Sequence, residues 1–271
     1  YLTMATEVAQ GRPVLIDQYL EGREVEVDAV SDGEDVLIPG IMEHVERAGV
    51  HSGDSMAIYP GLTLSETEVD TLVDYTVRIG RALGVKGLMN IQYVIVGGNP
   101  YRSPDLDRTP APTTVYVIEV NPRASRTIPF ISKVTDMPMV RVATKVMLGK
   151  TLKEQGYGSG LWRRQNLVAV KAPVFSMSKL IGVDTYLGPE MKSTGEVMGI
   201  DSNFRSAVTK ALIAGGLMLP REGSALLSIA DRDKAEALAI IRMLASQGYR
   251  FYATEGTGAM LIALGISVTM V

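Results

Sequence analysis

The pattern that decides how this chain folds is VIEVNPR, residues 117–123. Apolar and polar residues alternate in it, which predicts a β-strand with two different faces. Glu119 and Asn121 lie two residues apart and therefore share one face. A carboxylate and an amide oxygen suit Mg²⁺ that also holds nucleotide phosphates, and the Arg123 guanidinium at the strand exit suits a phosphate or carboxylate. The same residues could equally form an edge strand with a solvated polar face.

A second apolar segment, LMNIQYVIV at residues 88–96, predicts the strand that pairs with the first. Between them lie two glycines and the segment 99–114, whose four prolines and many polar groups are typical of a mobile loop. Strand, loop and strand together predict a hairpin with an enlarged connection. Because a polar amide inside so apolar a strand needs a partner, we expect Gln92 to lie across from Glu119 and Asn121 as a third oxygen ligand.

Alternating residues predict three further strands before this hairpin. They span residues 14–20, 24–30 and 36–42, with a turn at 31–33 between the last two. The middle strand carries Glu24, Glu26 and Asp28 on one face. Exposed, solvated charges are the ordinary interpretation of such a face.

Helices are predicted where apolar residues recur at helical spacing. A capping box, SETE at residues 65–68, begins one of them. Its apolar stripe consists of Val69, Leu72, Val73, Val77 and Leu83. Residues 137–148 and 203–214 predict two more, the second capped by Asp201 or Ser202.

The chain changes character after a region of weak periodicity at residues 151–223. From residue 225 strands and helices alternate, which predicts a parallel sheet with helices outside it. Strands are expected at 225–230, 249–254 and 266–271, with helices running to Gln247, from a cap at Asp231 or Asp233, and over 259–264. The turn at 254–258 leads into a helix, so its backbone N–H groups could attract a phosphate, although a plain glycine turn is an equal alternative.

The composition is that of a globular protein, with 46% hydrophobic and 21% charged residues among 271. A net charge of −3 gives no reason to expect nucleic acid or an anionic membrane as a partner. The chain has no cysteine, which excludes disulfides and thiol chemistry. No apolar run reaches membrane-spanning length and no signal peptide is visible, so we expect a cytoplasmic protein.

Four phrases of the sequence, taken in order, resemble the large subunit of carbamoyl phosphate synthetase. They lie at residues 41–55, 87–92, 118–127 and 187–199 and read IMEHVERAGVHSGDS, GLMNIQ, IEVNPRASRT and LGPEMKSTGEVMG. The Glu-x-Asn-Pro-Arg element alone is shared by many ATP-grasp ligases, whereas the first and last phrases are highly specific. The resemblance covers essentially the whole chain and indicates part of a longer protein, within the second of the family's two ATP-grasp halves.

The resemblance implies a layout of three parts and a fold class that combines α/β with α+β. Residues 1–150 would belong to an ATP-grasp domain, with an antiparallel or mixed sheet and helices. Residues 151–223 would be a helical connecting region. Residues 224–271 would begin an allosteric domain with a parallel α/β fold resembling methylglyoxal synthase.

The resemblance also implies roles for individual residues. Two Mg²⁺ or Mn²⁺ ions would be held against ATP by Gln92, Glu119 and Asn121. The phosphoryl acceptor would be contacted by Arg123, while the role of Arg126 stays open. The nucleotide and a K⁺ ion would be bound by Glu24, His51 and Ser52. A nucleotide monophosphate effector, UMP or IMP, would be bound by Ser228, Lys234, Thr254 and Thr257.

The implied activity is that of an ATP-dependent ligase. The glutamine-hydrolysing enzyme makes carbamoyl phosphate from bicarbonate, ammonia and two ATP, for arginine and pyrimidine biosynthesis, and this region resembles the part that phosphorylates carbamate. A glutaminase small subunit and an oligomeric assembly would be its partners. Two alternatives are another ATP-grasp carboxylate–amine ligase, such as a biotin carboxylase relative, and a regulatory fragment without activity of its own.

Overall fold

A computed structural model of the protein describes residues 16–98, 112–176, 185–218 and 220–271. The chain forms two compact units, Tyr1–Gly216 and Leu217–Val271. Of the mobile loop predicted at residues 99–114, residues 99–111 lie outside the described residues. Among the helices of the described ranges, none combines the length and the apolar character needed to cross a membrane.

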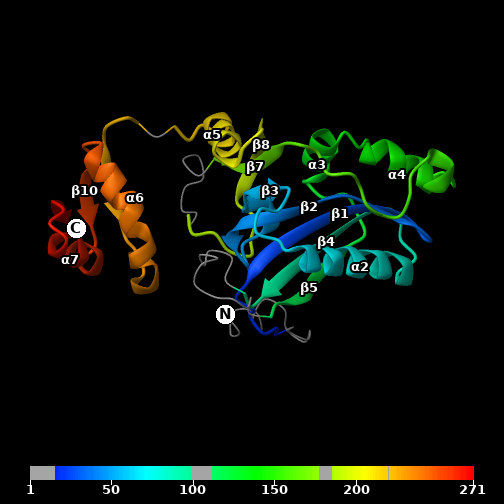
Figure 1. Ribbon diagram of the computed structural model, residues 1–271, viewed down its shortest axis with the longest axis horizontal. Helices are drawn as coiled ribbons and strands as arrows, with labels where there is room; N and C mark the ends of the chain where they lie inside the picture. The colour runs from blue at the N-terminus through cyan, green and yellow to red at the C-terminus, as the bar shows by residue number, and fades with distance from the viewer. Residues whose placement is uncertain (1–15, 99–111, 177–184, 219) are drawn as a thin grey trace, which may run out of the picture. The chain divides into compact units, whose positions relative to one another are not determined.

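An eight-stranded sheet forms the centre of the first unit (Figure 1). The strands are β1 (Arg23–Asp32), β2 (Val36–Arg47), β3 (Ala57–Tyr59), β4 (Lys86–Val96), β5 (Thr114–Asn121), β6 (Gly160–Leu161), β7 (Val168–Phe175) and β8 (Ser193–Asp201). Their order is β5-β4-β1-β2-β3-β7-β8, with β6 paired to β2 in parallel and every other pair antiparallel. The predicted hairpin of β4 and β5 is confirmed, and β5 is an edge strand.

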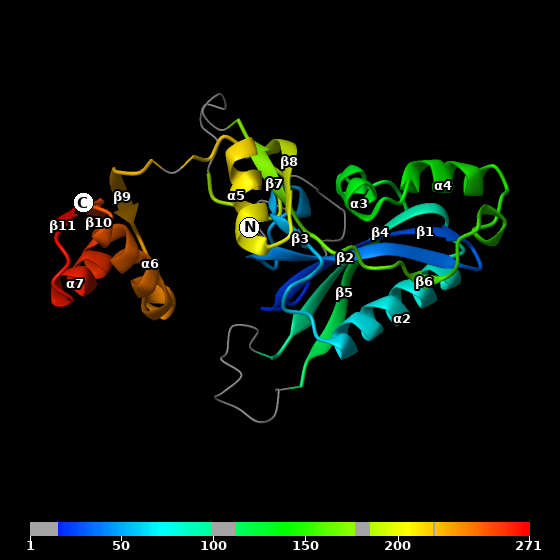
Figure 2. The same ribbon diagram turned by 45° about the horizontal axis from the view of Figure 1, so that its top comes forward.

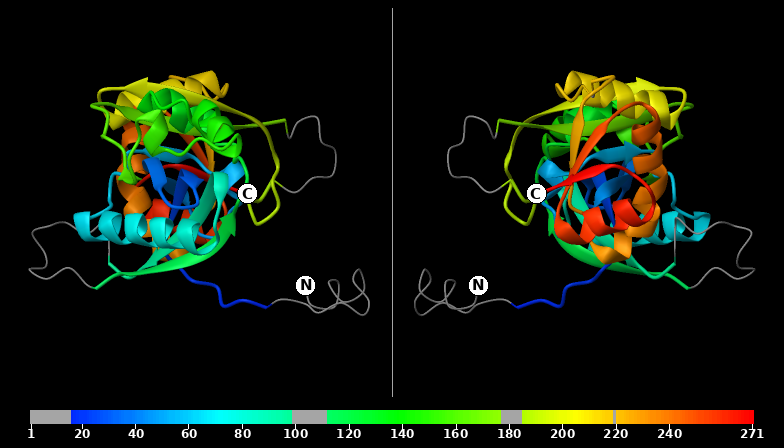
Figure 3. Two further views of the ribbon diagram at one scale, coloured as in Figure 1. Left: turned by 90° about the vertical axis from the view of Figure 1, so that its right-hand side faces the viewer. Right: turned by 90° about the vertical axis from the view of Figure 1, so that its left-hand side faces the viewer.

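Helices cover both faces of this sheet (Figure 2). They are α2 (Glu66–Ala82), α3 (Ile128–Thr135), α4 (Met139–Met147) and α5 (Phe204–Ala214). Figure 3 shows α2, in cyan, and the pair α3 and α4, in green, on opposite sides of the sheet. The last helix, α5, packs closely on β7 and β8. A Cβ atom at Gly199 would meet the Ala207 carbonyl oxygen at 2.1 Å, so only glycine permits this approach.

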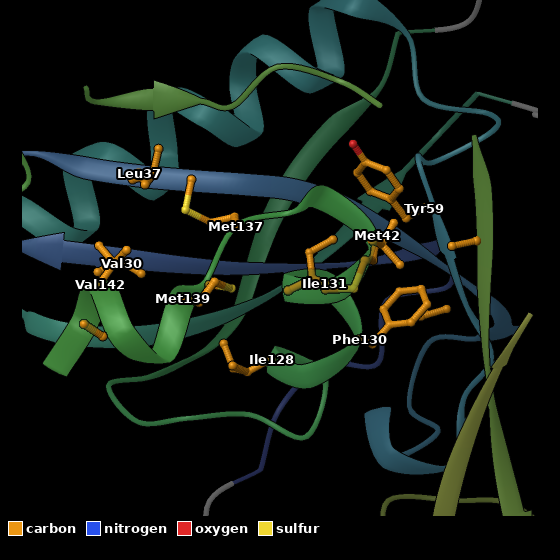
Figure 4. Close-up of a cluster of buried hydrophobic side chains, with 14 of the residues drawn as sticks. Val30, Leu37, Met42, Tyr59, Ile128, Phe130, Ile131, Met137, Met139 and Val142 are labelled. Carbon is orange, nitrogen blue, oxygen red and sulfur yellow. The ribbon is translucent and has the colours of Figure 1, made fainter. Parts of the chain in front are cut away.

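Each face of the sheet has its own apolar core. Beneath α3 and α4, Met42, Phe130 and Ile131 are buried together (Figure 4). On the opposite face, Leu72 of α2 is buried with Ile91 and other residues of β1, β2 and β4. Burying apolar surface on both sides stabilises the sheet by roughly 25 cal/mol per Å² removed from water and fixes its position between the helices.

The capping box predicted at Ser65 is confirmed at the start of α2. Ser65 Oγ accepts a hydrogen bond from the Glu68 backbone N–H at 3.3 Å, and Glu68 Oε2 accepts one from the Ser65 N–H at 2.8 Å. Leu83, predicted as part of the apolar stripe, is 60% exposed. It is the C-cap residue, and Gly84 then turns the chain with φ at +58°, so the buried stripe has already ended.

The prediction of a helical connecting region at residues 151–223 is wrong. β7 and β8 extend the main sheet as an antiparallel pair. The middle of β7 is buried on both faces, so its sequence VAVKAPVF is almost continuously apolar and gives no alternating signal. The cap of α5 is Asn203, whose Oδ1 accepts from the Ser206 N–H at 3.0 Å, and not the predicted Asp201 or Ser202.

Two further predictions need correction. The strand predicted at residues 14–20 has no regular structure in residues 16–20, and its first two residues lie outside the described ranges. The helix predicted at 137–148 begins only at Met139, because Pro138 lacks a backbone N–H and restricts the residue before it. The helix α3 has no counterpart among the predicted elements, and its C-cap residue, Asp136, is in the left-handed conformation.

The second unit contains a three-stranded sheet with two helices. Its elements are β9 (Ser224–Leu227), α6 (Lys234–Ser246), β10 (Arg250–Ala253), α7 (Glu255–Ala263) and β11 (Val268–Met270). The strand order is β11-β10-β9 and both pairs are parallel, which confirms the predicted parallel sheet. Its buried core is small and centres on Ile241, Phe251 and Leu261.

Candidate functional site

The three residues predicted to bind metal lie where β4 and β5 pair. Gln92 is directly opposite Glu119, and Asn90 is opposite Asn121. The Asn121 side-chain amide donates a hydrogen bond to Glu119 Oε1 at 2.8 Å. A bulge beside Gln92 shifts the register of the rest of the hairpin. The strand pairing therefore brings two amides and one carboxylate together on neighbouring strands.

A cavity of about 260 Å³ opens beside these residues. Five of the predicted site residues line it, and they are His51, Ser52, Gln92, Glu119 and Arg123. Asn121 and Glu24 are not among its lining residues. Further lining residues that the sequence analysis did not assign to the site are Glu26, Gly53, Asn90, Ser125, Arg126, Thr127, Lys171 and Met191. The structure thus gathers most of the predicted site and adds a set of polar residues to it.

One wall of the cavity is the short turn Ser52–Asp54, which follows β2. Gln92 Nε2 donates to Ser52 Oγ at 3.0 Å, and the Gly53 N–H donates to His51 Nδ1 at 3.0 Å. The Asp54 carboxylate accepts the backbone N–H groups of residues 192 and 193 at 2.7 Å each. The turn is therefore fastened both to β4 and to the segment before β8. Direct contacts thus join three of the four phrases that resemble the family.

The acidic face of β1 lies inside the protein. Glu24, Glu26 and Asp28 are 2%, 1% and 0% exposed, so the interpretation as solvated charges is wrong. His44 Nε2 lies 3.1 Å from Glu26 Oε2, and His44 Nδ1 lies 3.5 Å from Glu24 Oε1. Burial alone would lower the pKa of His44, but hydrogen bonds to the two glutamates outweigh it and raise the pKa to about 9. The imidazolium in turn holds the pKa of Glu26 at about 2 in spite of burial.

Asp28 occupies a different environment although it follows on the same strand. Its carboxyl group contacts Asn90 Nδ2 at 2.8 Å, Ser125 Oγ at 2.6 Å and Thr127 Oγ1 at 2.6 Å. Burial and the nearby charge of Glu26 raise the pKa of Asp28 to about 7, although these hydrogen bonds oppose the shift. Asp28 therefore connects β1 to the loop that carries the arginines.

Two arginines of that loop line the cavity. Arg123 Nη1 donates to the Ala124 carbonyl oxygen at 3.2 Å. Arg126 Nη1 lies 3.1 Å from Ser193 Oγ and 2.8 Å from Met191 Sδ. Each guanidinium has five N–H donors, so both can still donate to an anion in the cavity.

Lys171 is the site residue that the sequence analysis missed most clearly. It lies in the middle of β7, is 1% exposed, and lines the cavity. A lysine is almost never fully buried without a partner, so a lysine inside the apolar run VAVKAPVF was a usable signal. The prediction of a connecting region at residues 151–223 assigns Lys171 to no strand, so it does not use this signal.

The donor atoms of the described residues suit a cation that is also bound by phosphate. They do not suit a metal ion that is bound by protein side chains alone. Among the described residues, no group of three or more His, Cys, Asp or Glu side chains is arranged to hold a metal ion. Because Gln92 Nε2 donates to Ser52, the Gln92 amide oxygen is the atom left for a cation beside the Glu119 carboxylate. Mg²⁺ is commonly bound by one or two carboxylates together with substrate phosphates, so this donor set suits it only with a nucleotide present.

The predicted effector residues of the second unit lie around the start of α7. Lys234 Nζ donates to the Gly256 carbonyl oxygen at 2.8 Å, and Thr254 Oγ1 lies 3.5 Å from Ser228 Oγ. Thr257 is buried, and its hydroxyl contacts the Ile229 N–H at 3.0 Å. Three of the four side chains thus surround one turn, whereas the Thr257 hydroxyl joins α7 to the segment after β9.

The family model described as "Carbamoyl-phosphate synthase L chain, ATP binding domain" matches residues 2–155 of this chain. The chain belongs to this family. It is 56% identical over 271 residues to the carbamoyl phosphate synthase large chain of Thermoanaerobacter pseudethanolicus, covering all of this chain and 24% of that one. The large chain of Clostridium acetobutylicum is 54% identical over 267 residues, or 98% of this chain and 24% of that one. The chain therefore spans about a quarter of the length of these relatives.

A solved structure, the biotin carboxylase domain of a single-chain bacterial carboxylase, is also similar to this chain. The TM-score is 0.47 at 18% identity, over 73% of this chain and 46% of that one. The ATP-binding domain matched at residues 2–155 contains all the site residues predicted for the first unit. Lys171 lies beyond that range.

Proposed function

We propose that this chain is the part of a carbamoyl phosphate synthase large chain that transfers a phosphoryl group from ATP to carbamate. The whole, cytoplasmic enzyme would make carbamoyl phosphate from bicarbonate, ammonia and two ATP, for arginine and pyrimidine biosynthesis. The observation that carries the proposal is 56% identity to a carbamoyl phosphate synthase large chain over all 271 residues. The similarity therefore extends over the second unit as well as over the matched ATP-binding domain.

The cavity beside β4 and β5 would hold the ATP phosphates. Gln92, Glu119 and Asn121 would bind Mg²⁺ or Mn²⁺ there, and Arg123 would contact the acceptor. Bound divalent cations neutralise charge on a phosphoryl group in transfer. The chain's own contribution is to position the reacting groups and to exclude competing water, since phosphoryl transfer needs no protein nucleophile.

The turn after β2 would hold the nucleotide and a K⁺ ion. His51 and Ser52 line the cavity, while Glu24 lies behind it, against His44. We propose that His51 contacts the nucleotide and that Ser52 and Glu24 help to bind K⁺. The contact between Ser52 and Gln92 supports a single site in which the nucleotide and its cations share one wall.

The second unit would be the beginning of an allosteric domain resembling methylglyoxal synthase. Its parallel sheet and the turn before α7 support this assignment. Ser228, Lys234, Thr254 and Thr257 would bind the phosphate of UMP or IMP at a helix N-terminus. In the whole enzyme a glutaminase small subunit would supply ammonia, and the assembly would be oligomeric. The predicted boundaries at residues 150 and 223 belong to the same proposal, without the helical character predicted for residues 151–223.

Calorimetric titration of MgATP into the 271-residue chain tests the proposed site. We expect Glu119→Gln to weaken MgATP binding at least tenfold, because it removes the carboxylate that would hold the cation. Glu34→Gln, at an exposed carboxylate in the turn between β1 and β2, is the matched control and should bind as the wild type does. Equal binding by Glu119→Gln and wild type would show that the metal and nucleotide are held elsewhere.

The proposed reaction can also be followed in reverse. Carbamoyl phosphate and MgADP should yield ATP, and Glu119→Gln should abolish this activity while Glu34→Gln retains it. If carbamoyl phosphate gives no ATP although MgATP binds tightly, the chain holds the nucleotide without catalysing this transfer.

A further inference from the structure

Lys171 is a buried cation whose only hydrogen bond within the described residues is to a backbone oxygen. Nζ donates to the Ser52 carbonyl oxygen at 2.9 Å. No ion pair joins it to a carboxylate in the described part of the chain. An ammonium group has three N–H donors, and leaving donors of a buried charge unsatisfied is costly. Lys171 therefore has donor capacity at the wall of the cavity.

The neighbouring carboxylates do not use that capacity. Burial raises the pKa of Glu46 and of Glu196 against the opposing charge of Lys171, and the same charge helps to lower the pKa of Glu26, yet none of these carboxylates, all in the described ranges, forms an ion pair with Lys171. Glu26 is bonded to His44, and Glu46 accepts the Met56 N–H at 2.7 Å. Glu196 Oε2 is buried and has no hydrogen-bond partner among the described residues. The ammonium group thus points to Ser52 although an unsatisfied carboxylate oxygen lies near.

Lys171 separates two cavities. One is the cavity of about 260 Å³ that holds the predicted site residues. The other, of about 420 Å³, lies between α3 and β8 and is lined by Lys133, Lys171 and Glu196 among others. The Ser52 carbonyl that accepts from Lys171 belongs to the wall of the first cavity. The ammonium group is therefore presented to the candidate site.

The charges around the first cavity favour an anion next to Lys171. Lys171, Arg123 and Arg126 come from separate segments and line the same space. Of the two carboxylates that line it, Glu26 is neutralised by His44, and Glu119 lies on the hairpin with Gln92. Three cations against one uncompensated carboxylate leave the cavity suited to a small oxyanion.

We propose that Lys171 binds an oxyanion oxygen of the reacting groups in this cavity, belonging to the transferred phosphoryl group or to its carbamate acceptor. The proposal rests on the proposed function, because that function puts these anions in the cavity. Lys171 would then be a catalytic residue supplied by β7, outside the ATP-binding domain matched at residues 2–155. Its charge would stabilise the anion at the buried wall of the cavity, where Lys171 is 1% exposed.

The test measures binding of two probes to the 271-residue chain saturated with MgADP. Inorganic phosphate stands for the phosphoryl group, and bicarbonate stands for the planar carbamate. We expect Lys171→Gln to raise the dissociation constant of at least one probe tenfold or more, and Lys171→Arg to recover part of the loss. The affected probe identifies the group that Lys171 contacts. Unchanged binding of both probes by Lys171→Gln would overturn the proposal.

The choice of variants separates a charge effect from a structural one. Glutamine keeps N–H donors for the Ser52 carbonyl but removes the charge, so its thermal unfolding should stay close to that of Lys171→Arg. Lys133→Gln removes the exposed lysine that lines only the second cavity, and it should bind both probes as the wild type does. If Lys133→Gln and Lys171→Gln weaken binding equally, the effect is one of general charge and the proposal fails.

The same variants distinguish failure of the proposed nucleotide site from failure of the proposed role of Lys171. If Glu119→Gln leaves MgADP binding intact, the proposed nucleotide site is wrong, whatever Lys171 does. If MgADP binds and depends on Glu119 but neither probe responds to Lys171→Gln, the nucleotide site stands and only the role of Lys171 is lost. If the wild-type chain binds neither probe, with or without MgADP, the role of Lys171 is also overturned.

Discussion

Carboxylates on two strands of one sheet have opposite surroundings. On the central strand β1, Glu24, Glu26 and Asp28 are buried and contact other side chains of the interior. On the edge strand β5, Glu119 is exposed, and within the described residues its one hydrogen bond comes from Asn121. The same residue type thus has a structural role on one strand and is accessible to a ligand on the other.

Strand position accounts for this difference. A central strand has neighbours on both sides and helices on its faces, so a polar side chain there must find its partners inside the protein. β5 pairs only with β4, and its outward-facing acceptors can remain open to solvent or a ligand. We therefore expect substitutions on β1 and its partners to change mainly stability, and substitutions on β5 to change mainly binding.

The largest effect on stability is expected from His44→Ala. Removing the imidazolium leaves Glu24 and Glu26 buried without their cation, which costs about 3–5 kcal/mol of unfolding free energy. Because the folded-state pKa of His44 is raised to about 9 from its usual 6.5, this stabilisation is complete below pH 6.5 and is lost as pH rises through 9. Urea unfolding at pH 6 and pH 9.5 should show a smaller loss at the higher pH.

The matched control is His51→Ala, at the other histidine of the chain. His51 is half-buried and accepts one hydrogen bond from the Gly53 N–H, so its loss should cost about 1 kcal/mol. Equal losses of unfolding free energy in the two variants would show that His44 stabilises the buried glutamates no more than His51 stabilises its turn.

A smaller effect, of opposite sign, is expected from Asp28→Asn. Burial and Glu26 raise the pKa of Asp28 from 3.8 to about 7 in the folded chain. The folded state therefore binds the proton more strongly, and the stability that Asp28 provides is present below pH 3.8 and lost as pH rises through 7. Asparagine cannot ionise, so the variant should gain stability over the wild type at pH 8 and show no such gain near pH 4.

Unfolding free energies measured across this pH range, with Asp70→Asn as an exposed control on α2, test this expectation. The asparagine amide oxygen can still accept a hydrogen bond from the Thr127 hydroxyl, so the loop that carries Arg123 should keep its position and MgATP binding should persist. A loss of stability at pH 8 would mean that the ionised Asp28 is the form that the fold requires.

The sequence was sufficient for the hairpin, for α2 and for the parallel sheet of the second unit, because each has a local signal. The opposition of Gln92 and Glu119 followed from a polar residue in each of two apolar strands. The capping box at Ser65 fixed the start of α2. These features depend on residues close together in the chain, so periodicity and capping residues were enough to predict them.

The remaining features depend on contacts between distant residues. β7 joins the main sheet through β3, and its sequence carries no alternation because both of its faces are buried. The burial of Glu26 requires His44 from β2 and Thr127 from the loop after β5. No local pattern distinguishes such an acidic strand from a solvated one. Lys171 does have a local signal, because a lysine interrupts an apolar run, but that signal does not show which cavity the side chain lines.

The smallest effect on stability is expected from Glu119→Gln, which should lose MgATP binding. Glu119 is exposed and glutamine keeps an oxygen that can accept from Asn121, so the unfolding free energy should change by less than about 0.5 kcal/mol. Urea unfolding of the nucleotide-free variant, set beside its MgATP titration, measures both quantities on one protein. A large loss of stability would place Glu119 with the buried carboxylates of β1 and remove the distinction between the two strands. An unchanged stability with lost binding would show that the edge strand holds its carboxylate for a ligand.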